Sequence, residues 1–259
     1  MDLRSVIYDK AAGVARVTLN RPEQMNAISP ELLEDLDRVC DDVEHDPAIK
    51  VMTVTGAGRA FCAGADLKVV QELSPDPVRW RGFLELLHHV LNRIEALPQP
   101  VIAGINGLAL AGGLELVLVC DLAVADESAR IGDQHANFGL VAGGGGSQRL
   151  PRAVGLRRAK ELMLLGGWLS AQQALDWGLV QRIAPAGQVT AALDRIAGEL
   201  ATLSLSAGRT AKALANRALD VDLSTGLALE KAMVAEHMRS ADAVEGLRAF
   251  REKRKPRFA

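Results

Sequence analysis

The order of hydrophobic and polar positions predicts alternating strands and helices in the first part of the chain. Segments 5–8 and 14–19 alternate apolar and polar residues around a polar turn, which is typical of a β-hairpin. Ser29-Pro30 then begins a helix, because Ser is a good N-cap and Pro is favoured at the first helical position. A strand at 50–55 and a long helix at 77–97 continue the alternation. Helices between strands indicate an α/β core with parallel pairing.

The stretch 100–116 is the most distinctive part of this pattern. An apolar run, which predicts a buried strand, leads into the turn Asn106-Gly107 and then into Gly112-Gly113, where a helix begins. Glycines at a helix start let backbone N–H groups approach a ligand closely. Glu115 follows in the first turn and is the only charged residue in 96–120. Such a carboxylate is either an N-terminal helix cap or a catalytic acid/base.

In the second half of the chain, the predicted secondary structure changes twice. Short strands are predicted at 122–125 and 129–131, and a run of four glycines, 143–146, follows them. From Gly187 onward the chain is nearly all helix. The expected helices are 188–203, 206–219, 224–239 and 242–251. We therefore predict an α/β core over residues 1–186 and a C-terminal helical region over residues 187–259, which is too thin to have its own core.

A second loop, 56–68, is rich in Gly and Ala, so its backbone can contact a ligand; the alternative is an ordinary long surface loop. This loop contains Ala63-Gly64-Ala65, and the central turn contains Ala111-Gly112-Gly113. Two backbone N–H donors from separate loops can form an oxyanion hole for an enolate or a tetrahedral intermediate.

Composition excludes several other classes of function. The net charge of −2 and an aromatic content of 3% argue against a nucleic-acid partner. The longest uncharged stretch contains Pro and Gly, so we expect no membrane span. The five His and three Cys show no metal-ligand spacing, and the glycine-rich segments lack the P-loop and dinucleotide-binding patterns. Unpaired cysteines and no apolar N-terminal segment predict a cytoplasmic protein.

Over nearly its whole length, the chain resembles the crotonase, or enoyl-CoA hydratase/isomerase, superfamily. The motifs that carry the resemblance are Leu19-Asn20-Arg21-Pro22 with Asn26-Ala27, the loop 60–67, Ile105-Asn106-Gly107, Gly112-Gly113 with Glu115-Leu116, Cys120-Asp121, Gly139, the glycine run with Gln148-Arg149-Leu150, and Ala174 with Gly178-Leu179-Val180. The resemblance implies a ββα spiral core with a C-terminal helical oligomerisation region. It also implies homotrimers that often pair into hexamers.

The resemblance also implies an acyl-CoA substrate and no metal or redox cofactor. The thioester carbonyl would lie between the N–H groups of Ala65 and Gly112, which would stabilise an enolate. Family members bind CoA and the acyl group at positions that match Ala63, Ala65, Asp66, Leu67, Lys68, Gly112 and Gly143. In the hydratases of the superfamily, two glutamates act on the water and on the substrate α-carbon, and Glu115 matches the first.

The position of the second glutamate is occupied by His135. Histidine can be a general base near neutral pH, and some carbon–carbon hydrolases of the superfamily resemble this chain in having His here. Those enzymes add an Asp in the glycine run, where this chain has Gly144. The alternative is that His135 only lines the pocket or bonds a loop carbonyl.

Two other features leave alternatives open. His88 matches a catalytic His of the superfamily's dehalogenases, but the glycine run offers no Asp nucleophile, and a helix His is commonly only part of an amphipathic face. The basic residues near the C-terminus could meet CoA phosphates, even from a neighbouring subunit, or form a solvated tail. They are Arg248, Arg251, Lys253, Arg254, Lys255 and Arg257.

We expect an enoyl-CoA hydratase or dehydratase, with Glu115 as the principal acid/base and His135 as the second acid/base or water-positioning group. Two alternatives keep the same scaffold. The first is an isomerase or a carbon–carbon hydrolase that uses His135. The second is a CoA-binding subunit that has lost its chemistry.

Overall fold

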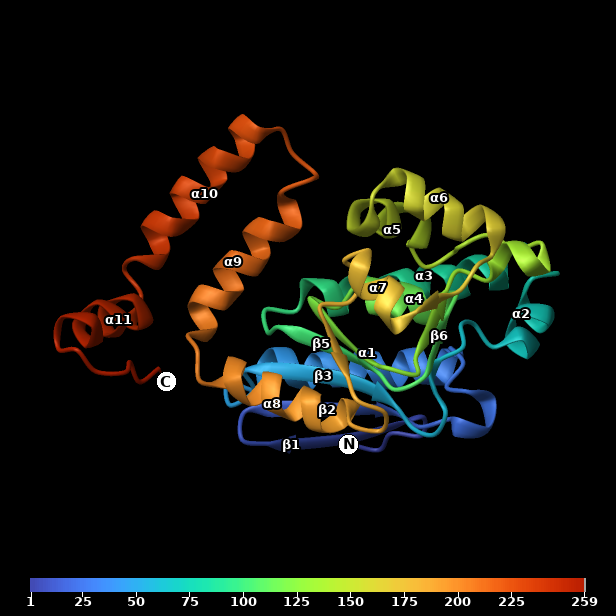
Figure 1. Cartoon of the computed structure of the whole chain (residues 1–259), viewed down its shortest axis with the longest axis horizontal. Coiled ribbons are helices and arrows are strands. Elements are labelled where there is room, and N and C mark those ends of the chain that lie inside the picture. The colour runs from blue at the N-terminus through green and yellow to red at the C-terminus, as the bar shows by residue number, and fades with distance from the viewer. Residues whose placement is uncertain (259) are drawn as a thin grey trace.

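The structure, a computed structural model, describes residues 1–258 and contains two sheets (Figure 1). The larger sheet contains, in spatial order, β1 (Val6–Ala11), β2 (Val14–Leu19), β3 (Val51–Gly56), β5 (Val101–Ile105), β7 (Leu122–Asp126) and β10 (Arg182–Ala184). The smaller sheet contains β4 (Ala60–Cys62), β6 (Leu108–Leu110), β8 (Arg130–Gly132) and β9 (Leu169–Ser170). The end strands β1 and β9 pair antiparallel with their neighbours, and all other pairs are parallel.

Strands of the two sheets alternate along the chain. Along the chain, β3, β5 and β7 of the larger sheet are followed by β4, β6 and β8 of the smaller sheet, respectively. The helices before the C-terminal region are α1 (Pro30–His45), α2 (Leu67–Leu73), α3 (Pro77–Ala96), α4 (Gly112–Leu118), α5 (Gly146–Val154), α6 (Leu156–Leu165) and α7 (Ala171–Asp176), with the 3-10 turns η1 (Pro22–Gln24) and η2 (His135–Phe138). The α/β class and the ββα spiral that we predicted are confirmed.

Several predicted elements form for the local reasons that the sequence suggested. The hairpin of β1 and β2 turns at Ala12 and Gly13, which both have positive φ, 52° and 78°. In α1, the Ser29 side chain accepts a hydrogen bond from the Leu32 amide at 3.3 Å, and Pro30 occupies the first helical position. The helix α3 begins at Pro77, as the pattern predicted, and the structure adds Asp76 as its N-cap.

Among the elements that the sequence did not predict are β4, β6 and α2, which surround the site described below. The strands β4 and β6 are three residues long and consist of small or mixed residues, so they show no period. The helix α2 begins at Leu67, within the last two residues of the predicted loop 56–68, and has no buried residue. Short elements of this kind depend on their tertiary neighbours, because a single turn or strand is unstable alone.

The larger sheet is covered on both faces, which explains why its central strands are almost entirely apolar. Val101 and Ala103 of β5 belong to the core that includes α1 and α3. Ile102 between them faces the opposite side and packs with Leu193 of α8 (Val189–Ala201). The domain boundary predicted between residues 186 and 187 stays a prediction. In the packing, however, α8 covers the sheet and belongs with the core.

The remaining helices are α9 (Leu205–Arg217), α10 (Leu223–His237) and α11 (Ala241–Arg251), and they extend away from the sheets (Figure 1). The predicted helical C-terminal region is thus confirmed, and α9 packs with α10 and α11. Among residues 1–258, no helix is both long and apolar enough to cross a membrane.

We predict that Gly113→Ala destabilises the fold by about 3 kcal/mol or more, because an added Cβ forces a main-chain shift. That Cβ would lie 2.0 Å from the Cys62 carbonyl oxygen, where α4 touches β4. Denaturant unfolding measures the change. Gly198→Ala is the matched control, since Gly198 is exposed in α8 with open space around it and should gain about 0.5–1 kcal/mol. Equal stability of Gly113→Ala and wild type would contradict the prediction.

Candidate active site

Two backbone turns meet at the centre of the molecule. The first follows β4 and contains Gly64, and the second joins β6 to α4 through Ala111 and Gly112. A Cβ on Gly64 would lie 3.1 Å from the Leu110 carbonyl oxygen and 3.3 Å from the Gly112 nitrogen. A Cβ on Gly112 would lie 3.3 Å from the Ala65 nitrogen. The amides of Ala65 and Gly112 are therefore neighbours, as an oxyanion hole requires.

Both of these amides are free to bind a ligand. Neither the Ala65 nor the Gly112 N–H donates a hydrogen bond to another group within residues 1–258. The amides beside them are bonded: Asp66 donates to the Ile28 oxygen and Ala111 donates to the Gly132 oxygen, each at 2.9 Å. Two unpaired donors side by side form a site that can accept a developing oxyanion.

The backbone of Ala111 is strained. It has φ 50° and ψ −115°, a region that L-residues rarely adopt. This conformation turns the chain abruptly from β6 into α4. Strain of this kind persists where the surroundings impose it, and it concentrates at functional sites.

Arg21, from the motif at 19–22, holds the first turn in place. Arg21 donates to the Ala27 oxygen and pairs with Asp66 at 2.9 Å. Asp66 also caps α2 through the Lys68 amide at 3.1 Å. The predicted CoA-binding residues follow one another here: Ala63 and Asp66 are partly buried, whereas Leu67 and Lys68 are exposed. The Asp66 carboxylate is thus committed to protein contacts that hold the turn.

Glu115 is buried, with 3% of its surface exposed. Its Oε1 accepts hydrogen bonds from the amides of Gly144 and Gly146, each at 2.7 Å, and Oε2 receives none from residues 1–258. The alternative that Glu115 caps its own helix is therefore wrong, because the carboxylate bonds the glycine run instead. Burial raises the pKa of Glu115, although the amides of Gly146 and Gly144 and the charge of His135 oppose the shift.

The glycine run must lack side chains to serve Glu115. A Cβ on Gly144 would lie 2.7 Å from Glu115 Oε2. Arg149 of α5 holds the run from behind by donating to the Gly144 oxygen at 3.1 Å and to Glu95 of α3 at 2.7 Å. The last predicted ligand-binding position, Gly143, faces Leu84, whose Cδ2 would lie 3.2 Å from an added Cβ. Local sequence patterns gave no sign of this role for Arg149, because its partners lie on a different helix and in the glycine run.

His135 stands at the start of η2, and its Nδ1 lies 2.8 Å from Asp133 Oδ1. Both side chains are largely buried, with 14% and 6% of their surfaces exposed. Burial lowers the pKa of His135, but the hydrogen bond and charge of Asp133, together with the charge of Glu115, outweigh it and raise the pKa above the ordinary value. Asp133 was not among the predicted site residues, although an Asp two residues before a His is a visible signal.

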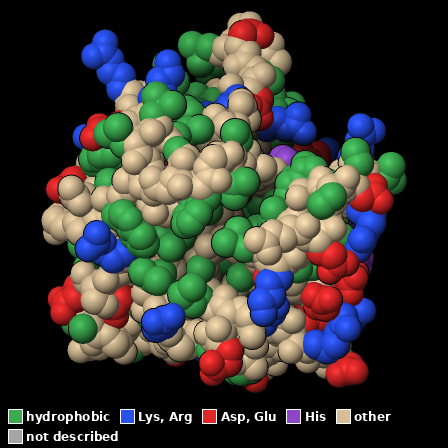
Figure 2. Space-filling view, turned by 90° about the vertical axis from the view of Figure 1, so that its right-hand side faces the viewer, with side chains coloured by type: hydrophobic (Ala, Val, Ile, Leu, Met, Phe, Trp, Pro, Cys, Tyr) green, Lys and Arg blue, Asp and Glu red, His purple; other side chains and the backbone are tan. Residues whose placement is uncertain are grey.

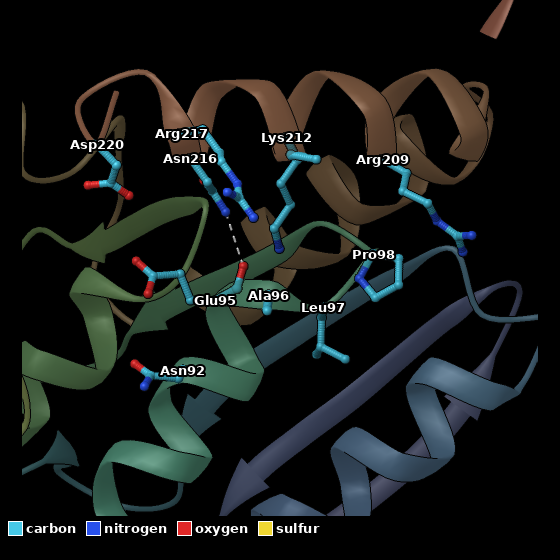
Figure 3. Close-up of a pocket in the computed structure, with 11 residues that line it drawn as sticks. Asn92, Glu95, Ala96, Leu97, Pro98, Arg209, Lys212, Asn216, Arg217 and Asp220 are labelled. Carbon is cyan, nitrogen blue, oxygen red and sulfur yellow. Dashed lines mark hydrogen bonds between the residues drawn. The ribbon is translucent and has the colours of Figure 1, made fainter. Parts of the chain in front are cut away.

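The structure does not bring His88 into this group. His88 is exposed on α3 and lines a groove with Arg149 and Asn216. A neighbouring cavity of about 530 Å³ lies between the end of α3 and α9, where Asn216 bonds the Glu95 oxygen at 3.2 Å (Figure 3). Its lining contains none of the predicted site residues. Among residues 1–258, no three His, Cys, Asp or Glu side chains converge in a way that could hold a metal ion.

Comparison with known proteins identifies the relatives of this chain. The family model described as enoyl-CoA hydratase/isomerase matches residues 9–259. The chain is 36% identical to the short-chain-enoyl-CoA hydratase of Clostridium acetobutylicum, over 98% of this chain and 97% of that protein. It is 40% identical to the mitochondrial methylglutaconyl-CoA hydratase of Mus musculus, over 97% of this chain and 81% of that protein.

A solved structure agrees with these relatives. The crystal structure of an enoyl-CoA hydratase from Bacillus anthracis superposes with a TM-score of 0.94 and 39% identity, covering 98% of this chain and 99% of that one. Sequence and fold therefore indicate one family. The free amides, the buried Glu115 and the glycine run lie together in this fold. The chain belongs to the enoyl-CoA hydratase/isomerase family of the crotonase superfamily.

Proposed function

We propose that this protein hydrates 2-enoyl-CoA thioesters by adding water across the α,β double bond. The observation that carries this proposal is the buried carboxylate of Glu115, which keeps one oxygen free of protein donors. A carboxylate held in this way can accept a proton from a water molecule. Relatives named as hydratases support the same reaction.

The Ala65 and Gly112 amides are proposed to bind the thioester oxygen. Addition to the β-carbon moves charge onto that oxygen, and two fixed N–H donors stabilise the enolate that forms. Because the protein holds these donors in place before the reaction, little reorganisation is needed when the charge develops. Loss of one such donor in other enzymes costs about 10²–10³ in rate.

Glu115 and His135 are proposed to divide the proton transfers. Glu115 takes one proton from water while the oxygen bonds the β-carbon. His135, as an imidazolium, gives a proton to the α-carbon as the enolate collapses. Glu115 then carries the extra proton and His135 lacks one, so one proton transfer between them restores the site. The product contains one added water.

The remaining ligand contacts are proposed from the family resemblance. Ala63, Asp66, Leu67 and Lys68 would lie along CoA, and Gly143 would border the acyl group. The scheme moves only protons and one hydroxyl group, so we propose no metal or redox cofactor. A cytoplasmic location likewise stays a proposal, based on the unpaired cysteines.

The alternative reactions are less well supported. A carbon–carbon hydrolase with an Asp at position 144 would need room for a side chain where Glu115 Oε2 already lies within 2.7 Å of an added Cβ. An inactive CoA-binding subunit would have no need to keep a buried carboxylate, which costs stability. Hydration therefore remains the favoured reaction.

We also propose that the protein forms a homotrimer, or a dimer of trimers, through its C-terminal helices. Large apolar side chains are exposed along α10 and α11, including Leu223 at 78% and Phe250 at 84%. On the opposite side of the molecule, away from these helices, hydrophobic side chains also gather over the middle of the face that carries α2 (Figure 2). Exposed apolar surface of this extent is typical of an interface between subunits.

Glu115→Gln should lower kcat for crotonyl-CoA hydration by about 10²–10⁴-fold with little change in KM, because a general base is lost. The Gln oxygen can still accept the Gly144 and Gly146 amides, so the variant should fold. Loss of absorbance from the conjugated thioester measures the rate. Glu85→Gln makes the same change on an exposed part of α3 and should leave the rate unchanged. A fully active Glu115→Gln enzyme would disprove the assignment.

Glu115→Gln should also raise Tm at pH 8. Burial raises the pKa of Glu115 in the folded state above its unfolded value, so wild-type stability falls as the pH rises from the unfolded pKa through the folded one. Gln does not ionise and avoids this loss. The difference in Tm should shrink when the pH falls below the folded pKa. Thermal scans from pH 4.5 to pH 8 (roughly the window that a raised Glu pKa defines) test this, and a pH-independent difference would contradict it.

Light scattering should give three or six times the mass of one chain. Leu247→Glu, which places a charge at a side chain 59% exposed on α11, should shift the protein toward smaller species. Ile7→Glu on β1, 54% exposed and outside the C-terminal helices, is the matched control and should not. A monomeric wild type would rule out the proposed assembly.

A further inference from the structure

The Asp133 carboxylate serves His135 twice. Its Oδ1 accepts from the His135 ring at Nδ1, 2.8 Å away, and from the His135 backbone amide at 3.1 Å. One oxygen thus holds both the ring and the main chain of the same residue. The two bonds together fix the direction of the imidazole relative to the backbone at the start of η2.

The segment that carries this pair is itself held firmly. Gln134, between the two residues, donates to the oxygens of Gly166 at 2.8 Å and Gly167 at 3.0 Å. Asn137 donates to the Gly166 oxygen at 2.9 Å. These bonds tie η2 to the turn after α6, so Asp133 and His135 cannot easily change their relative position.

With the Nδ1 hydrogen directed to Asp133, the other ring nitrogen, Nε2, is the one left for a ligand. Nε2 accepts or donates no hydrogen bond within residues 1–258. We propose that Asp133 is a positioning residue that presents His135 Nε2 as the proton donor for the substrate α-carbon. This proposal rests on the hydration reaction proposed above and explains how a histidine can replace the second carboxylate of that reaction.

Charge supports the same role. The charged groups that act on His135 are Asp133 from its own segment and Glu115 from α4. The turn after α6 contributes only backbone carbonyls to this segment. Burial lowers the pKa of His135, but the hydrogen bond and charge of Asp133, together with the charge of Glu115, outweigh this effect and favour the protonated imidazole. A proton donor must be protonated when the substrate binds.

Asp133→Asn removes the charge with little change in shape. NMR titration of the imidazole, assigned by the signal missing from His135→Gln, should show the His135 pKa lowered by about one unit or more. The alkaline limb of kcat/KM should move down by the same amount, and kcat near pH 8 should fall about tenfold or more.

Asp126→Asn is the matched control. Asp126 is buried and accepts from the Ser128 amide two residues later, in the same kind of turn, away from the site. It should leave both the His135 pKa and the alkaline limb unchanged.

The NMR measurements need no substrate, so they separate this proposal from the proposed function. Wild-type His135, when neutral, should carry its hydrogen on Nδ1, which the ¹⁵N chemical shifts report even if Asp133→Asn fails to fold. A neutral ring protonated on Nε2, or an unchanged His135 pKa in Asp133→Asn, would overturn the positioning role. Failure of the wild type to hydrate enoyl-CoA thioesters would instead count against the proposed function.

Discussion

The close approach of two backbone turns is the constraint on which the site depends. The start of α4 touches the end of β4 so closely that a Cβ on Gly113 would meet the Cys62 carbonyl oxygen at 2.0 Å. Only a residue without a side chain permits this contact. Because the two turns touch, the Ala65 and Gly112 amides become neighbours, and Glu115 is carried into the interior one turn later. Both the pair of neighbouring free amides and the buried carboxylate therefore follow from a single steric requirement.

The protein stabilises its buried carboxylate with main-chain dipoles, and no Lys, Arg or His within residues 1–258 forms a salt bridge with it. Two glycine amides bond one oxygen of Glu115, and Arg149 holds the same glycine run through the Gly144 carbonyl. A direct Arg–Glu pair would lower the pKa of the carboxyl group and occupy both of its oxygens. The indirect arrangement keeps the pKa raised and leaves one oxygen free. Burial of this carboxylate lowers the stability of the fold, as residues of active sites commonly do.

The second half of the site uses a different balance of charge. A pair of carboxylates places two like charges near one substrate, whereas here His135 pairs with Asp133, and the charges of Asp133 and Glu115 raise its pKa. This arrangement raises the pKa of His135 and favours its protonated form. The departure from the superfamily pattern at position 135 is therefore matched by a carboxylate two residues earlier that balances its charge. The two residues are best understood as one unit.

The sequence by itself determined the hairpin, the long helices and the α/β class, and it singled out Glu115 and His135 as candidate site residues, because caps, periodicity and motifs are local signals. Tertiary structure alone decided the rest. It created β4 and β6 by pairing them with each other, and it placed α8 on the sheet through Leu193. It also turned the Glu115 carboxylate away from its own helix and toward Gly144, 29 residues later. Such contacts join segments far apart in the chain, and no local pattern encodes the distance between them.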